Sequence, residues 1–183
     1  MVIETRILSF AVAGSITLAH EIVGTLIASI PDADGSTVAE ETLALLSVVS
    51  ARAVTAAAGD HRAGPAVSES LLDLPAVYYD YLLGGAVLTS AEGETDTSVY
   101  ERLLRKQQFY AVHFPHGERP SKRLLKDKME LWMGRLSPPG LPEHPAARLE
   151  RLDLVEAVAL HAQLVYEFAS RLCSGTSTPA AQS

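Results

Sequence analysis

The chain has 183 residues, of which 48% are hydrophobic and only 6% aromatic, and its formal net charge is −7. This length supports one domain with its own core, without disulfides or metal. The single cysteine, Cys173, excludes an internal disulfide, so we expect a reducing, cytoplasmic location. We expect one helical domain over residues 1–173 and a flexible C-terminal tail over residues 174–183.

Helix signals dominate the sequence, and strand signals are nearly absent. The first expected element is a long apolar helix from Val2 to Ile30, stopped by Pro31. A helix without a clean polar face must be covered by the rest of the protein, by a second copy or by a membrane. We expect this helix at the centre of a bundle or at a dimer seam. Its purely apolar face comprises Leu8, Val12, Ile16, Val23, Ile27 and Ile30.

The same stretch is long enough to span a bilayer. However, Glu21 would lie well inside the span, where an acidic side chain costs on the order of 2.5–3.5 kcal/mol. A secretory signal also lacks its positively charged start, because Glu4 balances Arg6. We therefore expect no membrane contact.

Local signals predict the boundaries of the next helices. A capping box of Thr37 and Glu40 predicts the start of a second helix, and Gly59 predicts its end. Residues 60–66, which include a Gly-Pro pair, are expected to form a loop. Pro75 should break or kink a third helical region that continues to about residue 88.

Three more helices are expected in the second half of the chain. They run from Ser98 to about His113, from about Ser121 to Leu136, and from Pro145 to Cys173. The last helix carries a core stripe spaced by fours and threes: Leu154, Val158, His161, Val165, Phe168 and Leu172. The predicted fold is an all-α, single-domain bundle of about five to seven helices. Its hydrophobic N-terminal helix lies at the centre, and the last helix packs against it.

Histidines on the two most apolar helices form the first candidate site. If these helices pack together, imidazole and carboxylate groups could converge on a small molecule or a metal ion. Nearby tyrosines could supply apolar walls with polar tips. The candidate ligand-binding residues are His20, Glu21, Tyr78, Asp80, Tyr81 and His161. The simpler interpretation is a buried neutral histidine with a hydrogen-bond partner, and we assign neither a metal nor a cofactor.

Glu40 and Glu41, with Glu69, Asp73 and Asp80 later in the chain, loosely resemble the Mg²⁺-binding carboxylates of helical nucleotide pyrophosphohydrolases. The match is incomplete, because no further acidic residue follows Glu41 closely and Pro75 interrupts the second helix of the pattern. We therefore interpret these acidic residues as a solvated face and helix caps.

Charge is distributed unevenly along the chain. Residues 1–100 hold three basic and thirteen acidic side chains, a net of −10, whereas residues 101–183 hold twelve basic and nine acidic, a net of +3. Basic residues interleaved with aromatic ones over 102–128 suit a phosphate or nucleic-acid site. The candidate residues are Arg102, Arg105, Lys106, Lys122, Arg123 and Lys126. A solvated face, or one that pairs with the acidic half of a neighbouring subunit, is the competing interpretation.

No nucleophile motif and no glycine-rich phosphate loop is present in the sequence. The leading functional hypothesis is a non-enzymatic helical interaction protein that forms a homo-oligomer. It rests on the two-sided apolar first helix and on the charge asymmetry. The first alternative is a small-molecule or metal-binding protein, conceivably an enzyme, with a pocket near His20, Tyr78, Tyr81 and His161. The second alternative is phosphate or nucleic-acid binding through residues 102–128.

Overall fold

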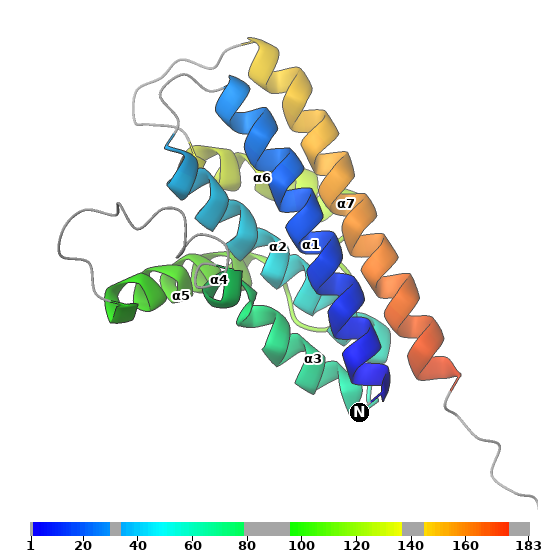
Figure 1. The fold of residues 1–183 in the computed structure, drawn as a ribbon. Helices are drawn as coiled ribbons and strands as arrows, with labels where there is room; N and C mark the ends of the chain where they lie inside the picture. The colour runs from blue at the N-terminus through cyan, green and yellow to red at the C-terminus, as the bar shows by residue number, and fades with distance from the viewer. Residues whose placement is uncertain (1, 30–33, 79–95, 137–144, 176–183) are drawn as a thin grey trace, which may run out of the picture.

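The computed structural model describes residues 2–29, 34–78, 96–136 and 145–175. Within these ranges the chain forms seven α-helices and no strand, which confirms the all-α prediction. The helices pack together as a bundle (Figure 1). Their bounds are α1 (Val2–Ser29), α2 (Gly35–Ala58), α3 (Ala63–Leu72), α4 (Leu74–Tyr78), α5 (Asp96–His113), α6 (Lys122–Leu136) and α7 (Pro145–Ser174).

The centre of the bundle is α2. It contacts all six other helices, and 18 of its 24 residues are buried. By contrast, α1 has only six buried residues among 28 and packs on α2, α3 and α7 (Figure 1). The central hydrophobic helix near the N-terminus is therefore α2 and not the Val2–Ile30 segment that the sequence pattern favoured.

The buried face of α1 differs from the expected apolar face. Leu8, Val12, Ile16 and Val23 are only half-buried, and Ile27 is exposed. Small side chains on the buried face let α1 approach α2 closely, because helix separation depends on side-chain size at the contact. The buried residues of α1 are Ile7, Ala11, Ser15, Ala19, Ile22 and Leu26.

The N-terminus of α2 is capped by Asp34 and not by the predicted Thr37–Glu40 box. The Asp34 carboxylate accepts hydrogen bonds from the backbone N–H groups of Ser36 and Thr37 at 3.3 and 3.0 Å. It also accepts a hydrogen bond from the Thr37 hydroxyl at 2.6 Å. The side chain that the sequence assigned as the cap therefore donates to Asp34 instead. At the other end, Gly59 has a positive φ of 52° and ends the helix as predicted.

The predicted loop at 60–66 is wrong in its second half, because α3 already begins at Ala63. Pro65 fits there, since the first turn of a helix has backbone N–H groups without helical partners. The break at Pro75 is confirmed: α3 ends at Leu72, and the short α4 begins at Leu74. The rest of the third predicted region, beyond Tyr78, lies outside the described residues.

The last three helices agree closely with the sequence patterns. The start of α6 is capped by Ser121, whose hydroxyl accepts a hydrogen bond from the Leu124 N–H at 3.2 Å. The helix α5 begins at Asp96, two residues before the predicted start at Ser98. In the stripe along α7, the first four members are buried and Phe168 and Leu172 are half-buried.

Two helices, α1 and α2, are long and apolar enough to cross a membrane by length and composition. In the most apolar stretch of α2, 83% of the residues are buried in the bundle, as in the core helix of a soluble protein. The corresponding share in α1 is 28%. Of these two helices, α1 is therefore the one whose apolar surface its own chain covers less.

The cap of α2 is directly testable. We expect Asp34→Ala to lower the free energy of unfolding by about 1 kcal/mol, because two backbone N–H groups lose their acceptor. Thr37→Ala should have a smaller effect, since Asp34 keeps both amide hydrogen bonds. Urea denaturation measures both variants. A larger loss for Thr37→Ala would restore the capping box predicted from sequence.

Candidate functional site

A groove of about 470 Å³ lies between α1 and α7, which run antiparallel on one side of the bundle (Figure 1). Three large hydrophobic side chains on its walls are exposed: Phe10 by 38%, Leu160 by 56% and Leu164 by 45%. Phe10 also stacks on Phe168 of α7, with ring centroids 4.3 Å apart. The groove is lined by Phe10, Ala13, Gly14, Thr17, Leu18, Glu21, Ala157, Leu160, His161 and Leu164.

The imidazole of His161 lies in the wall of this groove, against Gly14. A Cβ atom at position 14 would lie 2.9 Å from His161 Cε1 and 3.1 Å from Nδ1, so only glycine leaves room for the ring. On its inner side, His161 Nε2 is 2.9 Å from the Ser50 hydroxyl and 3.1 Å from the Ser15 hydroxyl. The two hydroxyls are themselves 3.1 Å apart. These three side chains join α1, α2 and α7 at one point.

The histidine at this junction is neutral at physiological pH. Burial lowers the pKa of His161 to about 4, because the imidazolium form would lose its hydration. A neutral ring can accept a hydrogen bond from one serine hydroxyl at Nε2, and Nδ1 then carries the proton and is a donor. This agrees with the simpler interpretation made from the sequence, a buried neutral histidine with hydrogen-bond partners.

A serine beside a neutral histidine is a pattern that nucleophilic enzymes use. Here Ser15 and Ser50 are both fully buried, so neither hydroxyl is accessible to a substrate in the groove. Among the described residues, no carboxylate hydrogen-bonds to the ring of His161 to orient it. The geometry is that of a structural polar junction and not of an activated nucleophile.

The other residues of the first candidate site fall into two groups. His20 Nε2 and the Tyr78 hydroxyl are 2.6 Å apart, which joins α1 to α4. Glu21 shares the groove with His161, whereas His20 does not line it. Asp80 and Tyr81 lie outside the described residues. Within the described part of the chain, no three His, Cys, Asp or Glu side chains are grouped to hold a metal ion.

The most strongly ionic part of the described chain is buried, and the solvated-face interpretation of its carboxylates is wrong. Glu40 and Glu41, near the start of α2, are only 3% and 2% exposed. Arg102 of α5 donates two hydrogen bonds to Glu40, at 3.1 and 2.8 Å. Arg135 of α6 donates two to Glu41, at 2.7 and 2.9 Å.

Lys106 lies between the two carboxylates. Its Nζ is 3.1 Å from Glu40 Oε2 and 3.0 Å from Glu41 Oε1. Burial alone would raise the pKa of Glu41, but hydrogen bonds from Arg135 and Tyr110 and the charge of Lys106 hold that pKa below its ordinary value. The Tyr110 hydroxyl donates to Glu41 at 2.6 Å, and burial beside this carboxylate raises the pKa of the phenol. We call these six residues the ionic cluster: Glu40, Glu41, Arg102, Lys106, Tyr110 and Arg135.

The ionic cluster also accounts for the incomplete resemblance to Mg²⁺-binding pyrophosphohydrolases. Both α2 carboxylates are occupied by cationic side chains of α5 and α6, so their oxygens do not face a cavity. Glu69 and Asp73, the next acids of the pattern, are exposed and lie outside the cluster. The two carboxylates of α2, in the acidic half of the chain, are thus paired with cations of the basic half.

The six cations of the predicted phosphate site do not form one surface. Arg102 and Lys106 belong to the ionic cluster, whereas Arg105 is exposed and lies 3.7 Å from the Glu101 carboxylate. These three residues of α5 therefore do not present one cationic face. In α6, Arg123 and Lys126 are exposed.

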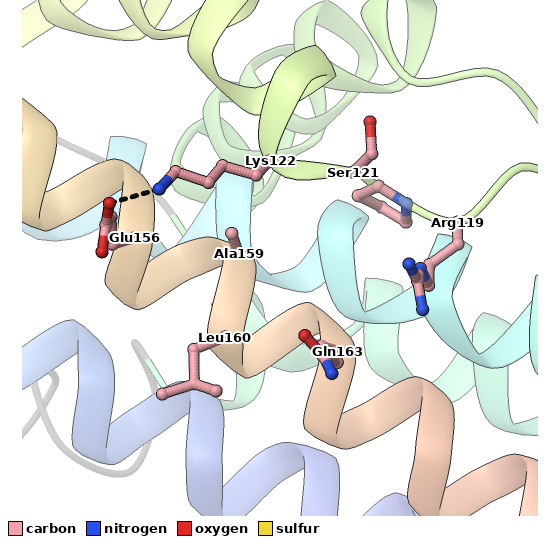
Figure 2. A pocket seen from close by; sticks show the side chains of 8 residues that line it. Arg119, Ser121, Lys122, Glu156, Ala159, Leu160 and Gln163 are labelled. Carbon is pink, nitrogen blue, oxygen red and sulfur yellow. Dashed lines mark hydrogen bonds and ion pairs between the residues drawn. The ribbon is translucent and has the colours of Figure 1, made fainter.

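Lys122, the last of the six, lines a second pocket of about 250 Å³ near the start of α6 (Figure 2). Its ammonium group forms an ion pair with Glu156 of α7. Arg119, at the other end of this pocket, lies over the Tyr166 ring, 5.1 Å from the centroid. The two cations are directed to different protein partners and do not converge (Figure 2).

Sequence patterns missed several polar contacts inside the bundle. Arg52 of α2 is buried and donates from Nε to the Phe114 carbonyl, at 2.9 Å, just beyond the end of α5. Gln107 donates to the Ser47 hydroxyl at 3.0 Å and to the Leu72 carbonyl. The available signal was a series of single polar residues in an otherwise apolar α2, which indicates buried groups with specific partners.

Comparison of the chain with protein-family models, with curated proteins and with solved structures gives no match in any of the three. The buried carboxylates of the described interior are paired with cations, and only the Thr42 hydroxyl and the Trp132 indole N–H are buried there without a partner. The α1–α7 groove, by contrast, is open and largely apolar. The groove is the surface feature that calls for an explanation.

The ionic cluster predicts a large difference between two neighbouring lysine and arginine variants. Lys106→Met should lower the free energy of unfolding by about 3 kcal/mol, because two buried carboxylates lose their shared cation. Arg105→Met, one residue away, should change it by less than about 0.5 kcal/mol, since its ion pair is exposed. Urea denaturation measures both. Equal losses in the two variants would contradict the cluster.

The histidine junction predicts a specific loss of stability in acid. The folded pKa of His161, about 4, lies below the ordinary value of 6.5, so the unfolded chain binds more protons between these values. Stability should therefore fall by about 2 kcal/mol from pH 7 to pH 5. His161→Gln should remove this slope, as followed by urea denaturation at each pH. A slope unchanged in the variant would exclude His161 as its source.

Proposed function

We propose that this protein is a non-enzymatic helical assembly protein that associates with a second copy of itself through the α1–α7 groove. The observation that carries the proposal is the exposed apolar surface of the groove, formed by Phe10, Leu160 and Leu164. Large contiguous patches of exposed apolar surface on a folded protein are typical of interaction sites. Burial of such surface contributes about 25 cal/mol per Å².

The preformed character of the groove supports this function. Phe10 is held against Phe168 by ring stacking, and the junction of His161 with Ser15 and Ser50 fixes α1 relative to α7. A partner would therefore meet a surface whose backbone is already ordered, which reduces the entropy lost on association.

Charge asymmetry contributes less to the proposal than the apolar surface does. Part of the asymmetry between the two halves of the chain is neutralised inside the bundle by the ionic cluster. Apolar burial is weakly dependent on salt, whereas exposed ion pairs are screened. We therefore assign the association to the groove and expect it to persist at high salt.

Protein suits this groove better than lipid does. Glu21 lines the groove and lies eight residues from the end of α1, about 12 Å along the helix axis. An acidic side chain at that depth in a bilayer costs on the order of 2.5–3.5 kcal/mol. We accordingly propose a cytoplasmic protein whose α1 is covered by protein.

The test is a comparison of two surface variants. Sedimentation velocity in buffer without detergent should give the wild-type chain a mass of a dimer or larger at low and high salt. Leu160→Glu should shift the mass to that of a monomer, because it places a carboxylate in the groove. Val112→Glu, at an 82% exposed position on α5, is the matched control and should leave the mass unchanged.

Two results would contradict the proposed function. One is a wild-type chain that sediments as a monomer at every concentration and salt. The other is a chain that floats with liposomes and remains monomeric in their absence, which would assign the apolar surface of α1 to lipid.

A further inference from the structure

The solvent side of α1 carries a regular series of exposed residues beside the groove. Their spacing of three and four keeps them on one face of the helix. Most are small or apolar. A positive charge lies near the N-terminal end of the series, and a negative charge lies in its C-terminal half. The series is Arg6, Phe10, Ala13, Thr17, Glu21, Gly24 and Ala28. At Gly24, a Cβ atom would meet nothing within 4 Å, so this side of the helix is open.

Two charges in this series have no ion-pair or side-chain hydrogen-bond partner among the described residues. These are Arg6 and Glu21, both exposed. They are fifteen residues apart, about 22 Å along the helix axis, too far to reach each other within one chain. Glu21 also lines the groove. A partner that covers this face would therefore meet a positive group near one end and a negative group near the other.

The series has a simple internal symmetry. The midpoint between Arg6 and Glu21 falls between Ala13 and Gly14, and the midpoint between Phe10 and Thr17 falls at the same place. An antiparallel copy of the helix centred there would place Arg6 opposite Glu21, Phe10 opposite Thr17 and Ala13 opposite Gly14, whereas Gly24 and Ala28 lie beyond this symmetric part. The closest approach would fall on two small residues, Ala13 and Gly14, which allow two backbones to come near each other.

We infer that the partner on this face is the α1 helix of a second copy, packed antiparallel across a two-fold axis at Ala13–Gly14. In this arrangement Arg6 pairs with the partner subunit's Glu21, and Glu21 pairs with the partner subunit's Arg6. The inference rests on the proposed self-association and adds its geometry. A two-fold interface requires a self-complementary surface, and the part of this series from Arg6 to Glu21 is self-complementary in charge.

The flanking α7 helix fits the same arrangement. Leu160 and Leu164 lie on the α7 wall of the groove, so a helix seated against α1 would also contact them. The His161 ring fills the space directly beside Gly14. Each copy would contribute α1 and α7, and the interface would be a layer of four helices around the two-fold axis.

Charge reversal tests this register. Arg6→Glu and Glu21→Arg should each raise the dimer dissociation constant about tenfold or more at low salt, because each creates two like-charge pairs per dimer. The double variant Arg6→Glu/Glu21→Arg should recover most of the wild-type affinity, since both pairs return with their signs exchanged. Matched controls are Arg123→Glu and Glu69→Arg, which reverse exposed charges on α6 and α3. Neither control should change the dissociation constant.

Cysteine cross-linking provides an independent measurement. In a Cys173→Ala background, Ala13→Cys should form a disulfide between copies under mild oxidation, because residue 13 lies beside its own counterpart across the two-fold axis. Val112→Cys, on exposed α5, should form no disulfide between copies under the same conditions.

The outcomes separate this inference from the proposed function. A dimer that tolerates either single reversal, or that does not cross-link through position 13, would overturn the register while self-association stands. A wild-type monomer would overturn both. Loss of affinity in each single variant, its recovery in the double variant and cross-linking at position 13 together would support the inferred interface.

Discussion

The structure depends on the burial of α2, a helix that carries charges near both ends and apolar residues between them. Glu40, Glu41 and Arg52 are all removed from water, and a buried charge must be paired within the protein. Two helices, α5 and α6, supply the cations for the carboxylates, and the end of α5 supplies carbonyl groups for the arginine. The positions of these helices around α2 are therefore fixed by charge pairing as well as by apolar packing.

Local signals were sufficient to predict most of the fold. Pro75 and Gly59 mark helix boundaries in any context, because proline restricts the backbone dihedral angles and glycine permits angles that other residues avoid. Asp34 and Thr37 are both good capping residues, so local sequence could not decide between them. The choice of central helix failed for a different reason. Hydropathy ranks α1 above α2, but it cannot distinguish apolar surface covered by the same chain from surface left for a partner.

The candidate site was predictable only in part, because it depends on which helices meet. His161 was recognised as a polar residue on a core stripe, but its partners Ser15 and Ser50 come from two other helices, and no local pattern shows that these helices meet at His161. Likewise, the basic residues of α5 suggested a phosphate site until Lys106 and Arg102 proved to be the counter-ions of α2. Ion pairs between helices therefore give a structural role to charged side chains that look free in the sequence.

The central claim is that the apolar face of α1 is covered by a second copy of the chain. Hydrogen–deuterium exchange at two protein concentrations, on either side of the dissociation constant, tests it most directly. The account predicts that backbone amides near Ala13 in α1 and near Leu160 in α7 exchange more slowly at the higher concentration, while those around Val112 in α5 do not change. Exchange that is independent of concentration throughout α1 would contradict the account.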